Sequence, residues 1–438
     1  MEAGATGKGQ LLFALAILVA FAAALAIAAG RSEPPAAGAA VAPAEPEDLA
    51  HLATRLEPKV ARKVEELRGL RFHKVPEPEV VDSDYLNRLG QREYRRAGVR
   101  QGLGADEAEL RILGVLAPDE QLESIYGATG DLAAAAYDPH TDRLYVVSDA
   151  VNANQALVEF VLSHELTHAL EDQVFGLSNG AHLDDDASLA LTALTEGSAT
   201  AMMIDYASQH ISATDLLGAT AALGADDAGV PQFYVDQLTW TYLGGARFVT
   251  ALRALAGSWK LVDHAIADRP PATTEQVLHP DKYIHDEQPL PVSVATNELV
   301  SQGWRRADRA VAGELSTSQL LELGVDKTTA ERAAAGWGGD RYELWRQGAS
   351  PNGCEDPCRA DFVLVADWRM DTTADVGELR DALDGYVSEG LGGESVGSGV
   401  WRVDAGFAAV QADGDRVALV FAPNADTATA VAAEQVTP

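Results

Sequence analysis

The pair of histidines in His164-Glu165-Leu166-Thr167-His168 is the feature that most constrains the fold of this chain. It lies inside an apolar pattern of period 3.6, which predicts a helix over about residues 155–175. Residues i and i+4 share one face of a helix, so both imidazoles can reach one tetrahedral ion, with Glu165 beside the open coordination position. The alternative is a pair of core histidines that are satisfied by hydrogen bonds. The first interpretation requires a packed helical core built around a metal site.

A second helix supplies a candidate for the third metal ligand. It is predicted to begin after the acidic cap Asp184-Asp185-Asp186 and to end near residue 208. Glu196 lies in the middle of its otherwise apolar face, and a buried carboxylate needs a metal or a cation as its partner. Gly197 has no side chain, which would let this helix approach the first one closely. The alternatives are a salt-bridged or exposed Glu196, or a ligand from the acidic cap.

The other periodic segments predict an α+β fold with a mostly helical core. We assign residues 47–126 to a helical lead-in and residues 127–300 to the core. β-branched and aromatic residues at 133–137 and 144–147 flank a turn cluster, which predicts a hairpin. The Pro-rich stretch 270–291 is expected to be irregular. Helical patterns cover about residues 47–70, 83–98, 105–126 and 232–255.

Strands and helices alternate from residue 301 onward, which predicts a small C-terminal α+β module over 301–438. The glycine-rich segment Gly336–Asp340 is expected to be a turn, and it lacks the Lys and Ser/Thr of a phosphate-binding loop. Cys354 and Cys358 are expected to form one small disulfide loop in an oxidising compartment and to be free thiols elsewhere. The module carries no catalytic motif.

The N-terminal segment Leu11–Ala29 has 19 uncharged, almost entirely apolar residues, close to the ~20 that a helix needs to cross a bilayer. It predicts one transmembrane anchor, with a cleaved signal peptide as the alternative. The Pro- and Ala-rich stretch 31–46 is typical of an extended tether. The protein is therefore expected at the cell membrane as a single-pass protein with the bulk of the chain outside the cytoplasm, or secreted if the segment is cleaved.

The net charge narrows the choice of partners. The 438 residues include 33 Lys and Arg against 66 Asp and Glu, so the formal net charge is −33. This charge repels nucleic-acid phosphates, so we expect no nucleic-acid partner. No sequence feature indicates the oligomeric state.

The histidine motif and the downstream glutamate together resemble the gluzincins, the thermolysin-like zinc metallopeptidases. The resemblance covers about residues 130–285. It implies a zinc ion bound by His164, His168 and Glu196, with Glu165 as the general base and acid. The interval between the last two ligands, 28 residues, is longer than that group typically has. The runs Leu-Thr-His-Ala-Leu-Glu-Asp-Gln, Tyr-Asp-Pro and Thr-Glu-Gln-Val-Leu-His-Pro also resemble uncharacterised bacterial membrane-anchored zincins.

The resemblance implies a zinc-dependent endopeptidase whose substrate is a peptide or protein. Zinc would acidify a water molecule and polarise the peptide carbonyl, and Glu165 would pass the water proton to the leaving amine. One alternative is a catalytically inactive binding or regulatory protein that keeps the zincin scaffold. Another is a zinc hydrolase of non-peptide substrates. Residues 47–126 are either part of the working enzyme or an inhibitory pro-segment.

Three supporting roles are expected around the metal. Leu144–Val147 resembles the zincin edge strand that pairs with an extended peptide, the alternative being a plain structural strand. Asp172 would hold a ring nitrogen of His168, four residues before it, or else lie at a solvated helix end. His279 is the expected oxyanion-stabilising residue. The other candidates for that last role are Tyr283, His264, His182, Tyr234 and Tyr242.

Overall fold

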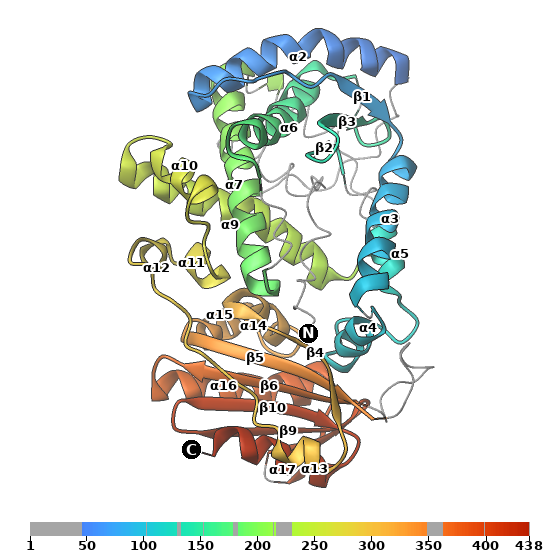
Figure 1. The fold of residues 1–438 in the computed structure, drawn as a ribbon, viewed down its shortest axis with the longest axis vertical. Helices are drawn as coiled ribbons and strands as arrows, with labels where there is room; N and C mark the ends of the chain where they lie inside the picture. Colours follow the sequence, from blue (N-terminus) through green and yellow to red (C-terminus); the bar gives the residue numbers. More distant parts are fainter. Residues whose placement is uncertain are drawn as a thin grey trace.

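The computed structural model shows a helical part and a part built on an antiparallel sheet, stacked along the long axis of the molecule (Figure 1). The predicted α+β class is confirmed. The predicted anchor at Leu11–Ala29, His182 and both cysteines lie outside the described residues. The structure describes residues 46–101, 103–128, 133–151, 153–177, 183–212, 214–215, 230–347, 362–397 and 399–437.

Two long helices form the centre of the helical part. α6 (Gln155–Phe175) and α7 (Asp185–His210) pack against each other, and their bounds confirm the two helices predicted around the histidine motif and Glu196. α6 is buried without interruption from Ala156 to Glu171. Because a helix that is buried on every face must lie inside a core, the histidine motif sits in the interior of the protein.

Two further helices cover this centre. α9 (Gln232–Ala256) packs along α7, and α2 (Pro46–Arg68) lies across α6 at the end of the molecule farthest from the large sheet (Figure 1). The apolar residues of α2 recur every three or four positions, as in an amphipathic helix, and belong to the same core cluster as α6. They are Leu49, Leu52, Ala53, Leu56, Val60 and Val64.

Shorter helices complete this part, and they correct two sequence predictions. The single helix expected at 105–126 is interrupted, because Gly114 adopts φ 72° and such left-handed glycines end helices. The stretch 270–291, expected to be irregular, contains two short helices. The shorter helices are α3 (Ser83–Gln101), α4 (Leu103–Ile112), α5 (Leu122–Ala128), α10 (Lys260–Ala267), α11 (Thr274–Leu278) and α12 (Pro280–Ile284).

A three-stranded sheet lies beside α6 in the order β1-β3-β2. β2 (Ala135–Asp138) and β3 (Arg143–Val147) form the predicted antiparallel hairpin, and β1 (Pro78–Val81) pairs with β3 in parallel. β3 is therefore the central strand, and the prediction that Leu144–Val147 is a peptide-binding edge strand is wrong. Its backbone groups are already paired on both sides, whereas only an edge strand can accept another chain. The edge strand that contacts α6 is β2.

The C-terminal part is built on a seven-stranded antiparallel sheet in the order β4-β5-β6-β10-β9-β8-β7. The segment Gly336–Asp340, expected to be a turn, instead forms the beginning of strand β5 (Trp337–Arg346) from Trp337 onward. Its glycines allow close backbone contact, since a Cβ on Gly339 would lie 2.2 Å from the Leu290 carbonyl oxygen. The strands are β4 (Arg305–Ala310), β5 (Trp337–Arg346), β6 (Phe362–Met370), β7 (Glu394–Gly397), β8 (Val400–Val403), β9 (Gly406–Asp413) and β10 (Arg416–Ala422).

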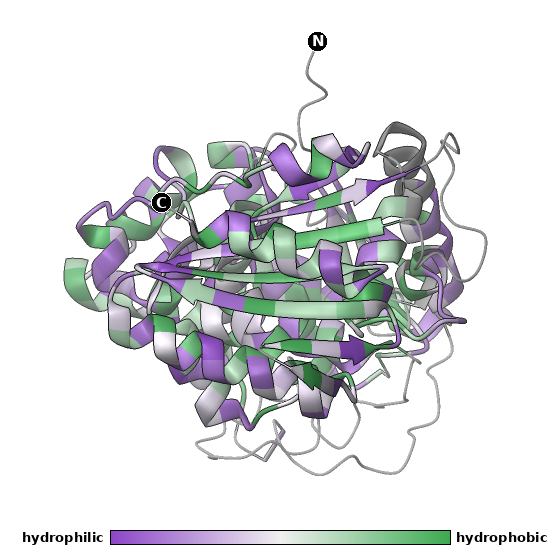
Figure 2. Cartoon of the chain, turned by 90° about the horizontal axis from the view of Figure 1, so that it is seen from below, coloured by the Kyte–Doolittle hydropathy of each residue, from purple (hydrophilic) through white to green (hydrophobic). Residues whose placement is uncertain are grey.

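Helices cover both faces of this sheet. Alternate residues along a strand point to opposite faces, so Leu364 packs with α14–α16 while Val363 and Val365 pack with α13 and α17. The strands in the middle of the sheet are accordingly mainly hydrophobic in Figure 2. The elements of these two layers are α13 (Asn297–Ser301), α14 (Gly313–Leu321), α15 (Lys327–Ala334), α16 (Thr373–Gly385), the π-helix η4 (Tyr386–Gly390) and α17 (Ala425–Val436).

The two parts meet at the N-terminal end of α7. The Asp186 carboxylate accepts hydrogen bonds from the Thr274 hydroxyl (2.5 Å) and backbone N–H (3.1 Å), and the same hydroxyl oxygen accepts from the Leu315 N–H at 3.2 Å. Gly313 lies against the same carboxylate, since a Cβ there would be 1.8 Å from Oδ1. The start of α7 is thus fixed by α11 and α14.

The expected membrane location depends on a helix that can cross a bilayer. Within the described ranges no helix has both the length and the hydropathy needed to cross a bilayer. This finding overturns the expectation of a single-pass cell-membrane protein with the bulk of the chain outside the cytoplasm.

Candidate metal centre

Capping residues fix the register of the two central helices. Asn154 at the start of α6 accepts a hydrogen bond from the Leu157 backbone N–H at 3.1 Å, and Gly176 ends the helix at φ 71°. Asp184 caps α7 by accepting from the Ala187 N–H at 3.0 Å. The expected helix cap is therefore confirmed at Asp184, and the motif of α6 and Glu196 of α7 fall in the middle of their helices.

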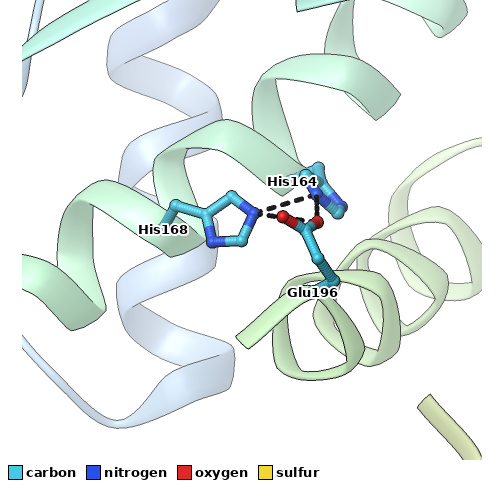
Figure 3. Close-up of side chains that lie close together, drawn as sticks. All are labelled: His164, His168 and Glu196. Carbon is cyan, nitrogen blue, oxygen red and sulfur yellow. Dashed lines mark hydrogen bonds and ion pairs between the residues drawn. The ribbon is translucent and has the colours of Figure 1, made fainter. Parts of the chain in front are cut away.

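The side chains of His164, His168 and Glu196 converge between α6 and α7 (Figure 3). His164 Nε2 lies 3.1 Å from Glu196 Oε2 and 3.0 Å from His168 Nε2. His168 Nε2 lies 3.3 Å from the same Glu196 oxygen. The two nitrogens and the oxygen therefore form a compact triangle, and the predicted juxtaposition of these three residues, here called the triad, is observed.

The triad is buried, and its charges depend on one another. Burial lowers the pKa of His164 to about 4, so this imidazole is neutral at pH 7. Burial also opposes the positive charge of His168, but the Glu196 carboxylate outweighs it and raises the pKa of His168 to about 9. Burial opposes the charge of Glu196 as well, yet His168 and His164 lower its pKa to about 2. Without a metal, one proton on His168 compensates one carboxylate.

Glu165 lies beside the triad, 2% exposed, and burial raises the pKa of its carboxyl to about 8. Its Oε1 atom is buried and has no hydrogen-bond partner among the described residues. The backbone N–H of Tyr137 in the edge strand β2 lowers this pKa in part. A carboxyl group with a pKa near neutrality and an uncommitted oxygen is suited to exchanging protons with a ligand.

These residues fit a zinc ion. Two imidazoles and one carboxylate are the donor set of a catalytic zinc site, which leaves a fourth position for water or substrate. The three ligand atoms lie within 4.8 Å of one another, so one ion can contact all of them. The proton shared by the triad in the absence of metal is the charge that a cation would replace.

The charge of the triad predicts how zinc affinity depends on pH. Because the pKa of His168 is raised to about 9, a proton competes with zinc for its nitrogen at neutral pH. We expect the apparent zinc affinity to rise by roughly tenfold per pH unit between about pH 6.5 and 8.5 and to level off above about pH 9. Chelator competition across this range measures the slope. A flat profile would show that His168 is not a ligand.

Gly197 and Gly245 set the distance between α7 and α9. A Cβ on Gly197 would lie 2.1 Å from the Gly245 carbonyl carbon, and a Cβ on Gly245 would lie 1.9 Å from the Ala193 carbonyl oxygen. The two backbones therefore touch directly. Gly197 was expected to allow a close approach to the histidine helix, but the close approach is to α9.

Substitution of Gly245 by Ala is expected to destabilise the protein by about 3 kcal/mol, because the methyl group meets backbone atoms of α7 that cannot move aside. Gly377→Ala is the matched control, since Gly377 lies in α16 and a Cβ there meets nothing within 4 Å. The control should stabilise by up to about 1 kcal/mol. Chemical denaturation measures both values, and an equal effect of the two substitutions would contradict the contact.

Other acids near the site have structural partners. Asp172 does not hold His168: its Oδ2 accepts a hydrogen bond from the Tyr137 hydroxyl at 2.9 Å, and its Oδ1 accepts from the Leu177 N–H at 3.0 Å. It ties the hairpin to the end of α6 and is half-buried there, so the metal-supporting role does not describe it. In the acidic cap, Asp185 accepts from the Tyr342 hydroxyl at 2.7 Å. None of the cap residues belongs to the triad.

His279 does not belong to the triad and is paired with Glu314 instead. Its Nε2 lies 2.9 Å from Glu314 Oε1 at the junction of the two parts, and this pairing raises the pKa of His279. α11 and α12, which flank His279, lie near the opposite end of α7 from α2 in Figure 1. Of the other candidates, Tyr283 donates to the Arg269 carbonyl at 2.8 Å and His264 pairs with Asp268 at 2.9 Å.

Tyr242 is the candidate that the structure places in contact with a triad residue. Its ring stacks on that of His164 with centroids 5.7 Å apart and an interplanar angle of 24°. The tyrosine is 1% exposed and lies on α9. The interpretation as a core residue holds, and its packing also fixes the orientation of the His164 ring.

Sequence reasoning missed two buried glutamates of α6. Glu171 accepts hydrogen bonds from Arg68 Nε (2.7 Å) and from the Ser198 hydroxyl (2.6 Å). Glu159 accepts from Lys59 Nζ (2.8 Å) and from the Tyr206 hydroxyl (2.7 Å). A charged residue within an apolar helical segment is the signal that pointed to Glu196, and it applies equally to these two glutamates.

A second acidic group in the described chain has a geometry compatible with a metal, but a lysine occupies it. Glu275, Glu287 and Asp371 place one oxygen each within 4.8 Å of the others. Lys282 Nζ lies 2.6 Å, 2.8 Å and 3.3 Å from their carboxylates, respectively. The three carboxylates share this one ammonium group, so the cluster is an ion-pair network between α11, α12 and the C-terminal part.

A family model described as a domain of unknown function (DUF8575) matches residues 298–432. The matched segment contains the seven-stranded sheet and its helices, and it lies outside the triad. No curated protein and no solved structure matches the chain. The C-terminal part is thus similar to a domain of unknown function. The chemistry that the chain can perform is indicated by the geometry of the triad and Glu165.

Proposed function

We propose that this protein is a zinc-dependent hydrolase of peptide bonds. The observation that carries the proposal is the convergence of His164, His168 and Glu196 within 4.8 Å, with the buried carboxyl group of Glu165 on the adjacent position of the same helix. Glu196 could satisfy a merely structural pair of histidines, but such a pair would not require the second, uncommitted carboxyl group of Glu165. A closed structural zinc site would have four protein ligands, whereas the residues that the structure describes offer three.

The residues divide the chemistry between them. His164, His168 and Glu196 would hold the metal. When bound, zinc would supply Lewis acidity, which acidifies water and polarises the scissile carbonyl. Glu165 would accept the proton of the attacking water and deliver it to the leaving amine, and its raised pKa favours the protonated form that makes the second transfer. Tyr242, stacked on His164, keeps that ring in place during the reaction.

The site reaches solvent through one of its ligands. The side chain of His168 is 11% exposed, whereas those of His164 and Glu196 are 1% and 4% exposed. A substrate would therefore approach from the side of His168.

The direct test is chelator-sensitive proteolysis by the purified full chain. Casein and a mixture of quenched fluorescent peptides serve as substrates, and inductively coupled plasma analysis gives the metal content. We expect cleavage that is lost after removal of zinc and restored by stoichiometric zinc. Zinc binding without cleavage of any peptide would contradict the peptidase proposal and favour a zinc-binding scaffold without this activity.

A further inference from the structure

We propose that Glu171 is a positioning residue of the metal centre, held by Arg68 of α2 and Ser198 of α7, and that α2 is therefore a permanent part of that centre. The inference rests on the proposed function in one respect, that the triad binds zinc. It goes further in two ways. It assigns a role to Glu171, Arg68 and Ser198, which are not ligands. It also makes α2 part of the working centre, whereas the sequence left open that this helix belongs to a removable pro-segment.

The geometry places this network next to two of the three ligands. Glu171 follows His168 by three residues on α6, so the two side chains lie on neighbouring positions of one helix face. Ser198 follows Glu196 by two residues on α7. The hydroxyl of Ser198 donates to Glu171 Oε1 at 2.6 Å, which links α6 and α7 within one turn of their ligands.

A third helix fixes the same oxygen. Arg68, the last residue of α2, donates from Nε to Glu171 Oε1 at 2.7 Å, and both side chains are 0% exposed. Its guanidinium carbon lies 4.2 Å from the ring centre of Trp259, and its Nη1 lies 2.7 Å from Asp263 Oδ1. The guanidinium is thus held by an ion pair on two sides and by the Trp259 ring, although its Nη1 and Nη2 atoms and Glu171 Oε2 have no hydrogen-bond partner among the described residues.

Loss of this arrangement would disturb the positions of the triad side chains. The ligands of a metal site keep their geometry only when the groups behind them are held, and loss of such support weakens metal binding. Glu171 forms a buried ion pair with Arg68, and truncating one partner of such a pair leaves the other without compensation. Helices α6 and α7 would then shift relative to each other at the level of the ligands.

The chain contains a matched control for this network. Glu159 lies on α6 before the motif and accepts hydrogen bonds from Lys59 of α2 and Tyr206 of α7. The same three helices are therefore linked by the same chemistry. Tyr206 lies ten residues beyond Glu196, about 15 Å farther along α7, so this second link stabilises the helices away from the ligands.

The role of α2 follows from both networks and from its apolar face. Its residues Leu49, Leu56 and Val64 are 0–4% exposed in the cluster that surrounds α6. Removing α2 would expose this face, and it would also leave Glu159 and Glu171 as buried charges without their cations. An inhibitory segment that leaves during activation would not be built into the core in this way.

The test compares Zn²⁺ affinity and thermal stability in the full chain for Glu171→Gln, Ser198→Ala, Arg68→Met, Arg68→Lys and Glu159→Gln. Chelator competition gives the affinity, and the absorption bands of the Co²⁺-loaded protein report the ligand geometry. We expect Glu171→Gln and Ser198→Ala to bind zinc roughly 10- to 100-fold more weakly and to alter the Co²⁺ spectrum. Arg68→Lys should bind more tightly than Arg68→Met. Glu159→Gln should melt at a lower temperature with unchanged zinc affinity.

Each outcome separates the inference from the proposed function. If the wild type binds zinc and Ser198→Ala, which removes only one hydroxyl, binds it equally well, Glu171 is not a positioning residue. If Glu159→Gln and Glu171→Gln weaken zinc binding to the same extent, the networks act only through global stability, which also overturns the inference. If the wild type binds no zinc, the proposed function itself fails, and the positioning role fails with it.

Discussion

Replacement of Glu165 by Gln is expected to slow peptide hydrolysis by about 10²- to 10⁴-fold, the range that a positioned general base contributes. Glutamine has nearly the same shape but cannot accept and return a proton. The carboxyl group of Glu165 is buried, burial raises its pKa to about 8, and one of its oxygens lacks a partner among the described residues, so the substitution removes no hydrogen bond to that oxygen. The fold and the triad should therefore remain intact.

The measurement is the kcat/KM of the wild type and the variant on one peptide, with zinc content determined on the same samples. Zinc content should stay at about one ion per chain in both, because Glu165 is not among the three residues of the triad. Equal rates at equal zinc content would remove Glu165 from the mechanism. A loss of rate with a parallel loss of zinc would assign it a structural role instead.

Substitution of His168 by Ala is expected to weaken zinc binding on the order of 10²- to 10³-fold. Four-ligand zinc sites in small proteins bind with roughly 10–16 kcal/mol, so one ligand contributes about 2.5–4 kcal/mol, and each 1.4 kcal/mol is about tenfold. His168 is the more accessible imidazole of the triad, so its truncation leaves the smaller internal cavity. Peptide hydrolysis should be lost at zinc concentrations that saturate the wild type.

His264→Ala is the matched control for this prediction. The side chain of His264 is 47% exposed and pairs with Asp268 on the surface, so its removal should leave zinc affinity unchanged. Competition with a chromophoric chelator gives both affinities. The assignment of His168 as a ligand would be contradicted if the two variants retained the same affinity as the wild type.

The sequence predicted the triad because its signal is local. The spacing of His164 and His168 and the apolar setting of Glu196 are properties of single helices, and the caps Asp184 and Gly176 mark where those helices start and stop. The burial of every residue from Ala156 to Glu171 could not be predicted in this way. Some of the polar residues of α6 form hydrogen bonds within their own helix. The Ser163 hydroxyl donates to the Phe160 carbonyl at 2.6 Å, and the Thr167 hydroxyl donates to the Ser163 carbonyl at 2.7 Å.

Most of the sequence predictions that the structure corrects involve residues whose partners lie far away in the chain. Arg68 and Glu171 are 103 residues apart, and β1 pairs with β3 across more than sixty residues, so no periodic pattern connects them. His279 was chosen from the chemistry of its segment, but the pairing with Glu314 is set by how α11 packs on α14. The alternation of strands and helices in the C-terminal part was predicted because that pattern is local, whereas β4 and β7 carry few apolar residues and the glycines at the start of β5 indicated a turn.

X-ray absorption spectroscopy of the zinc-loaded full chain tests most directly whether α6 and α7 share one ion. The structure predicts two histidine nitrogens and oxygen donors that include one carboxylate, at a stoichiometry of about one zinc per chain, and the loss of one nitrogen donor in His168→Ala. A purified protein that takes up no zinc, or a zinc signal without the multiple-scattering pattern of imidazole, would contradict it.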